Sequence, residues 1–207
     1  MSNVGLEEYK RKRRFNETPE PEGKVRKAAG YSFVIQKHRA ASLHYDFRLE
    51  HDGVMLSWAV PKGPSLDPAT KRFAMQTEDH PIDYNRFEGV IPEGEYGGGT
   101  VMIWDHGLWE PEVPNVDAAL AKGDVKFTLY GKKLRGSWVL VRMRQRQWLL
   151  IKHRDQAASN LDITAVEFRS AVSGRTLAEI ARRDGASARQ LKQAEDADRT
   201  AASTGAV

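Results

Sequence analysis

The chain has 207 residues, of which 40% are hydrophobic and 29% are charged, and its formal net charge is +4. This composition suits a globular domain with a polar appendage, and the mild basic charge permits a polyanionic partner without requiring one. The lack of cysteine excludes disulfides and thiolate metal sites, no run of 18 apolar residues could span a membrane, and the first eight residues lack a secretory pattern, so we expect a cytoplasmic protein.

Residues 1–30 are predicted to form a basic N-terminal arm that looks poorly ordered in isolation. Lys10 to Arg14 is an unbroken run of basic residues. Such a run is either a solvated tail or an arm that lies along a phosphate backbone. Phe15 follows the run directly and suggests that the arm is anchored at this point.

Residues 31–155 alternate short strand patterns with turn signals, and Asp52-Gly53 is a strong signal for a hairpin. About eight antiparallel strands joined by turns are typical of a barrel or a sandwich. We predict one closed β-barrel with short flanking helices, because a barrel strand can pack one face and carry functional groups on the other. The predicted strands cover residues 31–37, 43–50, 54–60, 73–77, 100–105, 125–130, 134–143 and 148–152, with a helical turn at 82–87 and a helix at 116–122.

Residues 156–207 change in character and are predicted to form a helical and partly disordered C-terminal extension. Thr176 could cap a helix over residues 176–184, and a second, highly charged helix is expected over 188–199. The last segment, residues 201–207, consists of small and polar residues and is expected to be disordered.

The strand at 43–50 alternates strictly between apolar and polar residues, which indicates a half-buried strand. Its apolar face is ordinary core, and its polar face carries His44, Asp46 and Arg48 at two-residue steps. His38, six residues upstream of His44, could fold back beside them. Two imidazoles and one carboxylate form a complete ligand set for a divalent metal, and Arg48 could hold an anion that the metal also touches.

The ordinary interpretation of this polar face is a solvated strand surface, with Arg48 as an exposed salt partner of little energetic value. Asp46 argues against that interpretation, because aspartate is disfavoured in strands. His80, in Glu78-Asp-His-Pro81, is either a hydrogen-bonded loop residue or a phosphate ligand and proton donor. Lys62 and Arg72 could add positive charge to the same pocket, or could be plain surface charges.

Two rival functions use other chemistry. His44-Tyr-Asp46 could belong to a two-histidine, one-carboxylate iron oxygenase with His106 or His153 as the third ligand, but this leaves Arg48 and the basic arm without a role. A non-catalytic barrel that only grips nucleic acid would leave the row of His and Asp side chains unexplained.

Several longer motifs occur along the chain in a fixed order. The motifs are Phe15-Asn-Glu-Thr-Pro-Glu-Pro21, Gln36-Lys-His38, Leu43-His-Tyr-Asp-Phe-Arg-Leu-Glu50, Ser57-Trp-Ala-Val-Pro-Lys-Gly-Pro64, Glu78-Asp-His-Pro81, Tyr84 and Phe87-Glu-Gly-Val-Ile-Pro-Glu-Gly-Glu-Tyr-Gly97. Together they resemble the 3′-phosphoesterase module of bacterial DNA ligase D. The similarity runs from about Glu8 to Asp155, and Ser173-Gly-Arg-Thr-Leu-Ala-Glu-Ile180 resembles the segment that follows the module.

The resemblance implies a small β-barrel enzyme that depends on Mn²⁺ and acts in non-homologous end joining. Such enzymes remove a 3′-terminal ribonucleoside from DNA and then the 3′-phosphate that remains. The implied roles, carried over by motif, are metal ligation by His38, His44 and Asp46, phosphate binding by Arg48 and His80, an essential Tyr84, a diesterase role for Arg13 and Glu20 in the arm, and basic pocket positions at Lys62 and Arg72.

The implied partners are DNA ends with a 3′-ribonucleotide or 3′-phosphate and the ligase, polymerase and Ku proteins of end joining, and the chain itself is expected to be a monomer. Arg14 stands where family members can carry an acidic residue, a departure that bears on the balance between the two activities. The chain lacks a Lys-x-Asp-Gly motif for nucleotidyl transfer, and we expect that it cannot seal a nick itself.

Overall fold

The computed structural model describes residues 5–26 and 30–204, so the ends of the predicted arm and tail, residues 1–4, 27–29 and 205–207, lie outside it. The chain is mainly β, as predicted, with nine strands and a few helices. The strands are β1 (Ser32–Arg39), β2 (Leu43–His51), β3 (Val54–Val60), β4 (Lys71–Gln76), β5 (Gly89–Ile91), β6 (Gly99–Pro111), β7 (Asp124–Gly131), β8 (Arg135–Arg144) and β9 (Gln147–Lys152). The helices are α1 (Glu7–Arg11), η1 (Ile82–Arg86), α2 (Val116–Lys122), α3 (Ile163–Val166), α4 (Leu177–Arg183) and α5 (Ala188–Thr204).

Eight of the strands close into an antiparallel barrel, which confirms the predicted fold. They follow one another in the order β1-β2-β3-β4-β9-β8-β7-β6, and a β1–β6 pairing closes the ring. The short strand β5 pairs only with the first residues of β6 and adds a flap outside the ring. Asp52-Gly53 forms the predicted hairpin turn, with both residues at positive φ.

The barrel interior is packed with aromatic and aliphatic side chains from alternate positions of its strands. All five tryptophans are buried there, and the rings of Phe47 and Phe127 stack with centroids 5.7 Å apart. On β2 the inward residues are Tyr45, Phe47 and Leu49, so the polar residues between them point to the outside of the barrel.

The C-terminal helices pack against the barrel. Leu177, Ile180 and Ala194 are fully buried and belong to the same hydrophobic cluster as the barrel core. Thr176 caps α4 as predicted, in a capping box with Glu179. The expectation of disorder after residue 200 is wrong for residues 201–204, which continue α5. Within the described part of the chain, no helix is both long and apolar enough to cross a lipid bilayer.

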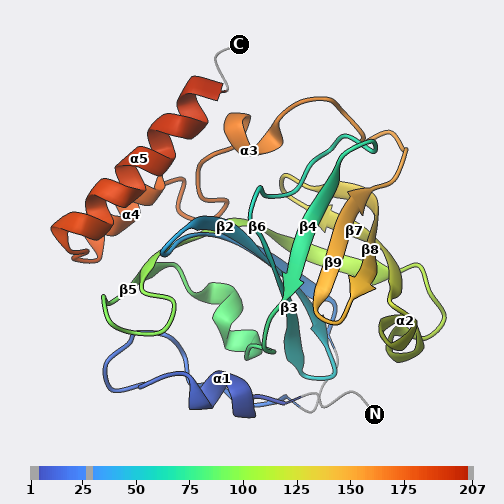
Figure 1. Cartoon of the computed structure of the whole chain (residues 1–207), viewed down its shortest axis with the longest axis horizontal. Coiled ribbons are helices and arrows are strands. Elements are labelled where there is room, and N and C mark those ends of the chain that lie inside the picture. The colour runs from blue at the N-terminus through green and yellow to red at the C-terminus, as the bar shows by residue number, and fades with distance from the viewer. Residues whose placement is uncertain (1–4, 27–29, 205–207) are drawn as a thin grey trace.

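The N-terminal arm lies on the outer face of the barrel, on the side where η1 and β5 lie (Figure 1). It is ordered by tertiary contacts that its polar sequence does not reveal. Leu6 and Tyr9 are buried against the barrel, and the Tyr9 hydroxyl donates to the carbonyl of Pro21 at 2.6 Å. The Tyr9 ring packs against the ring of Phe15, the predicted anchor, with centroids 5.8 Å apart. The arm therefore forms a cover over part of the polar face of β2.

Candidate metal and phosphate site

The β1–β2 hairpin brings the candidate metal ligands together by direct pairing across the two strands. His38 of β1 lies opposite His44 of β2, and Gln36 lies opposite Asp46. Residues opposite one another in an antiparallel pair project from the same face, so all four side chains share the outer face of the barrel. The polar face that the alternation predicted is therefore real, and it is covered rather than freely solvated.

His38, His44 and Asp46 each place one ligand atom within 4.8 Å of those of the other two. The Asp46 carboxylate lies 3.5 Å from Nδ1 of His38 and 3.6 Å from Nε2 of His44. Two ligand atoms bound to one cation at about 2.1 Å each are separated by about 3–4 Å. The spacing therefore fits a single divalent cation between the three side chains.

Backbone carbonyls fix the orientation of both imidazole rings. Nε2 of His38 lies 2.8 Å from the carbonyl of Gly97, and Nδ1 of His44 lies 3.1 Å from the carbonyl of Ser42. A carbonyl can only accept, so each of these nitrogens carries a proton and donates it. The other nitrogen of each ring faces Asp46, which is the arrangement by which proteins orient histidine ligands toward a metal.

Burial and neighbouring charges shift the pKa values of Asp46 and His44 in opposite directions. Burial alone would raise the pKa of Asp46, but the Arg48 guanidinium and hydrogen bonds from both histidines hold it well below its usual range. Burial opposes the charged form of His44, yet its hydrogen bond with Asp46 raises the pKa of His44 above its ordinary value. Asp46 is thus anionic at neutral pH, and a cation in the cluster must compete with a proton on His44.

Arg48 is buried and oriented by three partners. It donates from Nε to the Gln36 side chain at 2.9 Å and from Nη1 to the Ser57 hydroxyl at 2.9 Å, while Nη2 lies 3.2 Å from Asp46. Its guanidinium also lies over the Tyr84 ring, 5.0 Å from the centroid. Among the described residues these bonds use three of its five N–H groups, so donors remain for an anion beside His38, His44 and Asp46, the candidate metal cluster.

His80 lies beyond Arg48, at the phosphate end of the predicted site. Its Nδ1 donates to the carbonyl of Glu78 at 2.9 Å, and its Nε2 lies 3.3 Å from Nη2 of Arg13. Burial, with Arg48 and Arg13 close by, holds the pKa of His80 well below its ordinary value. The ring is therefore neutral at pH 7, and the lone pair of its Nε2 accepts from Nη2 of Arg13.

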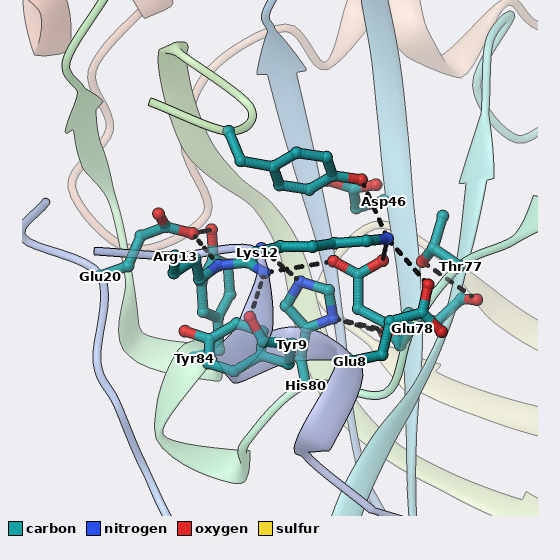
Figure 2. A network of polar contacts seen from close by, with 12 residues as sticks. Glu8, Tyr9, Lys12, Arg13, Glu20, Asp46, Thr77, Glu78, His80 and Tyr84 are labelled. Atoms are coloured by element: carbon teal, nitrogen blue, oxygen red, sulfur yellow. Dashed lines mark hydrogen bonds and ion pairs between the residues drawn. The ribbon is translucent and has the colours of Figure 1, made fainter. Parts of the chain in front are cut away.

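The arm adds a buried polar network to this end of the site, drawn in Figure 2. Arg13 donates from Nε to Glu20 at 2.9 Å and from Nη1 to Glu78 at 3.2 Å. The Tyr84 hydroxyl donates to the same Glu20 oxygen at 2.8 Å, and burial followed by the charge of Glu20 raises the pKa of Tyr84. Arg13, Glu20, His80 and Tyr84, assigned to one site from the sequence, thus meet in space.

Two of the predicted pocket residues lie farther from the cluster. Lys62 is exposed in the turn after β3, and Arg72 lies at the start of β4, on the strand face that points to the core. Val60, at the end of β3, pairs with Tyr45, the neighbour of His44. Lys62 and Arg72 therefore lie at the end of the barrel where His44 lies. Within the described residues, no hydrogen bond or ion pair joins either side chain to the metal cluster, and their predicted role stays a prediction.

Arg14 is exposed and forms an ion pair with Glu95 in the loop before β6, the same loop whose Gly97 carbonyl holds His38. The third ligands of the iron alternative are not in the cluster. Nδ1 of His153 is hydrogen-bonded to the Ser137 hydroxyl at 2.7 Å. His106 lies on β6 and pairs with Val34 of β1, so β1 separates it from β2. His38 fills the position that this alternative gave to a distal histidine.

Three residues of the site had no assigned role in the sequence analysis. Gln36 fixes Arg48 while its amide donates to the carbonyls of Tyr84 and Phe87, at 3.0 and 2.9 Å. Ser57 lies opposite Arg48 in the β2–β3 register, and Glu78 pairs with both Lys12 and Arg13. The hairpin at Asp52-Gly53 was the available signal for Ser57, because its register fixes which residue of β3 faces Arg48.

A closed β-barrel with a candidate cation-binding cluster beside a buried, oriented arginine would suit a metal-assisted phosphoesterase. Comparison with known proteins makes the class specific. The family model described as the DNA Ligase D 3′-phosphoesterase domain matches residues 36–142, about half of the chain. The chain belongs to this family, which implies a hydrolase.

Curated relatives extend the match. The multifunctional non-homologous end joining protein LigD of Pseudomonas aeruginosa is 52% identical over 168 residues, covering 78% of this chain and 20% of the relative. The proteins of the same name from Mycobacterium bovis and Mycolicibacterium smegmatis are 43% identical over 153 and 158 residues, in each case 73% of this chain, and 20% and 21% of the relatives. The chain thus spans about a fifth of the length of the curated relatives it matches.

Proposed function

We propose that this protein is a Mn²⁺-dependent phosphoesterase that processes DNA 3′ ends for non-homologous end joining. It removes a 3′-terminal ribonucleoside and then the remaining 3′-phosphate. The observation that carries this proposal is the convergence of His38, His44 and Asp46 beside Arg48 in a chain of the DNA ligase D 3′-phosphoesterase family. The names of the curated relatives supply the link to end joining.

The metal would be held by Nδ1 of His38, Nε2 of His44 and the carboxylate of Asp46. Imidazole and carboxylate together suit Mn²⁺, although they do not exclude other divalent transition metals. When bound, the cation supplies Lewis acidity toward phosphorus and lowers the pKa of a bound water. The protein contributes the fixed ring orientations described above, which cost no rearrangement when the cation binds.

The phosphate would be bound next to the metal by the free N–H groups of Arg48 and by His80. Negative charge arriving between Arg48 and Arg13 would raise the proton affinity of the neutral His80 ring. Its Nε2 would then take up a proton from solvent water and pass it to the departing oxygen. Arg48 would meanwhile stabilise the negative charge that grows on the equatorial phosphate oxygens.

The arm would serve mainly the diesterase step, because a terminal ribonucleoside extends past the phosphate toward Arg13, Glu20 and Tyr84. Lys62 and Arg72 would add positive charge at the His44 end of the barrel. The substrates are DNA ends with a 3′-ribonucleotide or a 3′-phosphate. Ligase, polymerase and Ku end-joining proteins are proposed partners, since the curated relatives that share this module are named for end joining.

The test is a 3′-end-labelled primer–template ending in one ribonucleotide, incubated with the protein and Mn²⁺ or with EDTA. We expect a 3′-phosphate product and then a 3′-hydroxyl, both absent with EDTA and both absent for His44→Ala. Binding of the primer without turnover would favour the nucleic-acid-gripping alternative. Iron-dependent oxygen consumption, measured separately, would favour the oxygenase.

A further inference from the structure

Tyr96 lies in the loop between β5 and β6, next to the candidate site, and has no role in the chemistry described so far. It is one of the large side chains that the fold leaves exposed, at 47% of its surface. The next residue, Gly97, accepts the hydrogen bond from His38 at 2.8 Å. The loop that carries Tyr96 is therefore fastened to the candidate metal cluster, and the ring lies beside Arg13, which contacts His80.

The position of the ring is set by two cations of the arm. Nζ of Lys12 lies 4.9 Å and Cζ of Arg13 lies 5.4 Å from the ring centroid, and Lys12 also donates to the Tyr96 hydroxyl at 3.4 Å. Both cations are themselves paired with the buried Glu78, at 3.0 and 3.2 Å. In the part of the chain that the structure describes, no other aromatic ring packs against Tyr96, so the ring is oriented yet remains half exposed.

An exposed, oriented aromatic ring beside a phosphate site is suited to stack against a nucleobase. Stacking accepts any base, because every base has a π-face, and it does not require a hydrogen-bonding pocket. The neighbouring cations favour the same use, since Lys12 and Arg13 would attract the scissile phosphate that joins the stacked nucleoside to the strand.

We propose that Tyr96 stacks against the base of the nucleoside beyond the scissile phosphate and thereby positions the substrate of the diesterase step. This inference rests on the proposed function. Stacking of this kind would accept a terminal ribonucleoside with any base. It also separates the two activities, because after the ribonucleoside has left, the 3′-phosphate substrate has no base at this position.

The experiment compares wild type, Tyr96→Leu and Tyr96→Phe on three primer–templates: one with a terminal ribonucleoside, one with a terminal ribose analogue that lacks the base, and one with a 3′-phosphate. We expect Tyr96→Leu to lower kcat/KM for the base-bearing end by roughly 10- to 100-fold, mostly through KM. Its rates on the base-free end and on the 3′-phosphate should equal those of wild type, and Tyr96→Phe should retain activity on all three.

The base-free substrate separates stacking from a structural role in holding the arm. If Tyr96→Leu slows the base-free and base-bearing ends equally, Tyr96 acts through Lys12 and Arg13, and the stacking proposal is wrong. Equal activity of wild type on both ends would also overturn it. A wild-type protein that is inactive on all three substrates with Mn²⁺ would instead refute the proposed function. Thermal unfolding of Tyr96→Leu checks that the variant folds.

Discussion

At the residue scale, Arg48 shows why charge alone does not define the site. Its guanidinium meets Gln36, Ser57 and Asp46 at once and keeps further donors free. An ammonium group at the end of a lysine chain cannot reproduce a planar fork with several partners. We expect Arg48→Lys to lower the rate of both activities by about 10²–10³-fold, the usual effect of removing one electrostatic donor.

Single-turnover rates with saturating Mn²⁺ measure this effect for each substrate. Arg144→Lys, at an exposed position of the β8–β9 hairpin, is the matched control and should leave the rates unchanged. Near-normal rates for Arg48→Lys would mean that a positive charge is sufficient there and that the hydrogen-bonding fork has no catalytic role.

Glu20 links Arg13 of the arm to Tyr84 of η1 and does not touch the metal cluster. Glu20→Ala should therefore slow ribonucleoside removal more than phosphate removal, because it leaves the buried Arg13 misplaced while Arg48 keeps its three partners. The ratio of the two rates is the measurement. Glu22→Ala, at an exposed position of the same arm, should leave that ratio unchanged, and equal losses in Glu20→Ala would count against a special role for the arm.

The site residues that the sequence could predict are those whose role follows from the pattern of one strand or of two adjacent strands. His44, Asp46 and Arg48 followed from alternation within one strand, and His38 required only that the neighbouring strand fold back. Ser57 was not assigned although the Asp52-Gly53 hairpin fixes its register against Arg48, and Gln36 could not be assigned, because no local signal fixes the register of β1 against β2. Glu78 carried no signal, because its partners Lys12 and Arg13 lie more than sixty residues away in the sequence.

At the scale of elements, the sequence predicted the barrel strands but not the pieces that cover the site. Strand β6 continues through Gly107 to Pro111, although glycine usually weakens a strand. Glycine is needed at position 107, because a Cβ there would clash with the backbone of Tyr130 on β7. Helix α1 has only five residues and β5 has three, and such short elements depend on tertiary contacts rather than on propensity. Both complete the surroundings of the site.

The docking of the arm should depend on pH through Asp79. Burial, with Glu78 and Glu8 nearby, raises the pKa of Asp79 to about 6, although the Gly5 N–H donates to it. The folded protein then binds more protons than the unfolded chain between pH 4 and 6, so stability from this group is lost as the pH rises through 6. Asp79→Asn, which cannot ionise, should be more stable than wild type at pH 8, by at most about 3 kcal/mol.

Chemical denaturation at pH 5 and pH 8, without metal, measures this difference in the free energy of unfolding. The gain from Asp79→Asn should shrink at pH 5, where Asp79 is already largely protonated. Glu17→Gln, an exposed arm position, should show no such pH dependence. A constant difference between Asp79→Asn and wild type across this range would contradict the account.

At the scale of the whole molecule, the closed barrel was predictable because eight short strands with turns at regular spacing leave few alternatives. The placement of the C-terminal segment was not predictable, because its apolar residues form only a narrow stripe among many charged ones. Ile180 of α4 is fully buried in the cluster that fills the barrel. We expect Ile180→Ala to lower the free energy of unfolding by about 2–4 kcal/mol.

Urea denaturation followed by tryptophan fluorescence measures that loss, because all five tryptophans report on the barrel interior. Leu161→Ala, at an exposed position, is the control and should change the free energy of unfolding little. A loss below about 1 kcal/mol for Ile180→Ala would mean that the C-terminal helices fold apart from the barrel, as a separate extension would.

The most direct measurement of the central claim is a crystal structure of the protein soaked with Mn²⁺ and sulfate, with anomalous data to locate manganese. We predict one manganese bound by His38, His44 and Asp46, with a sulfate beside it that contacts Arg48 and His80. Manganese bound elsewhere, or a cluster that stays empty at saturating Mn²⁺ while its three side chains keep their places, would contradict the assignment.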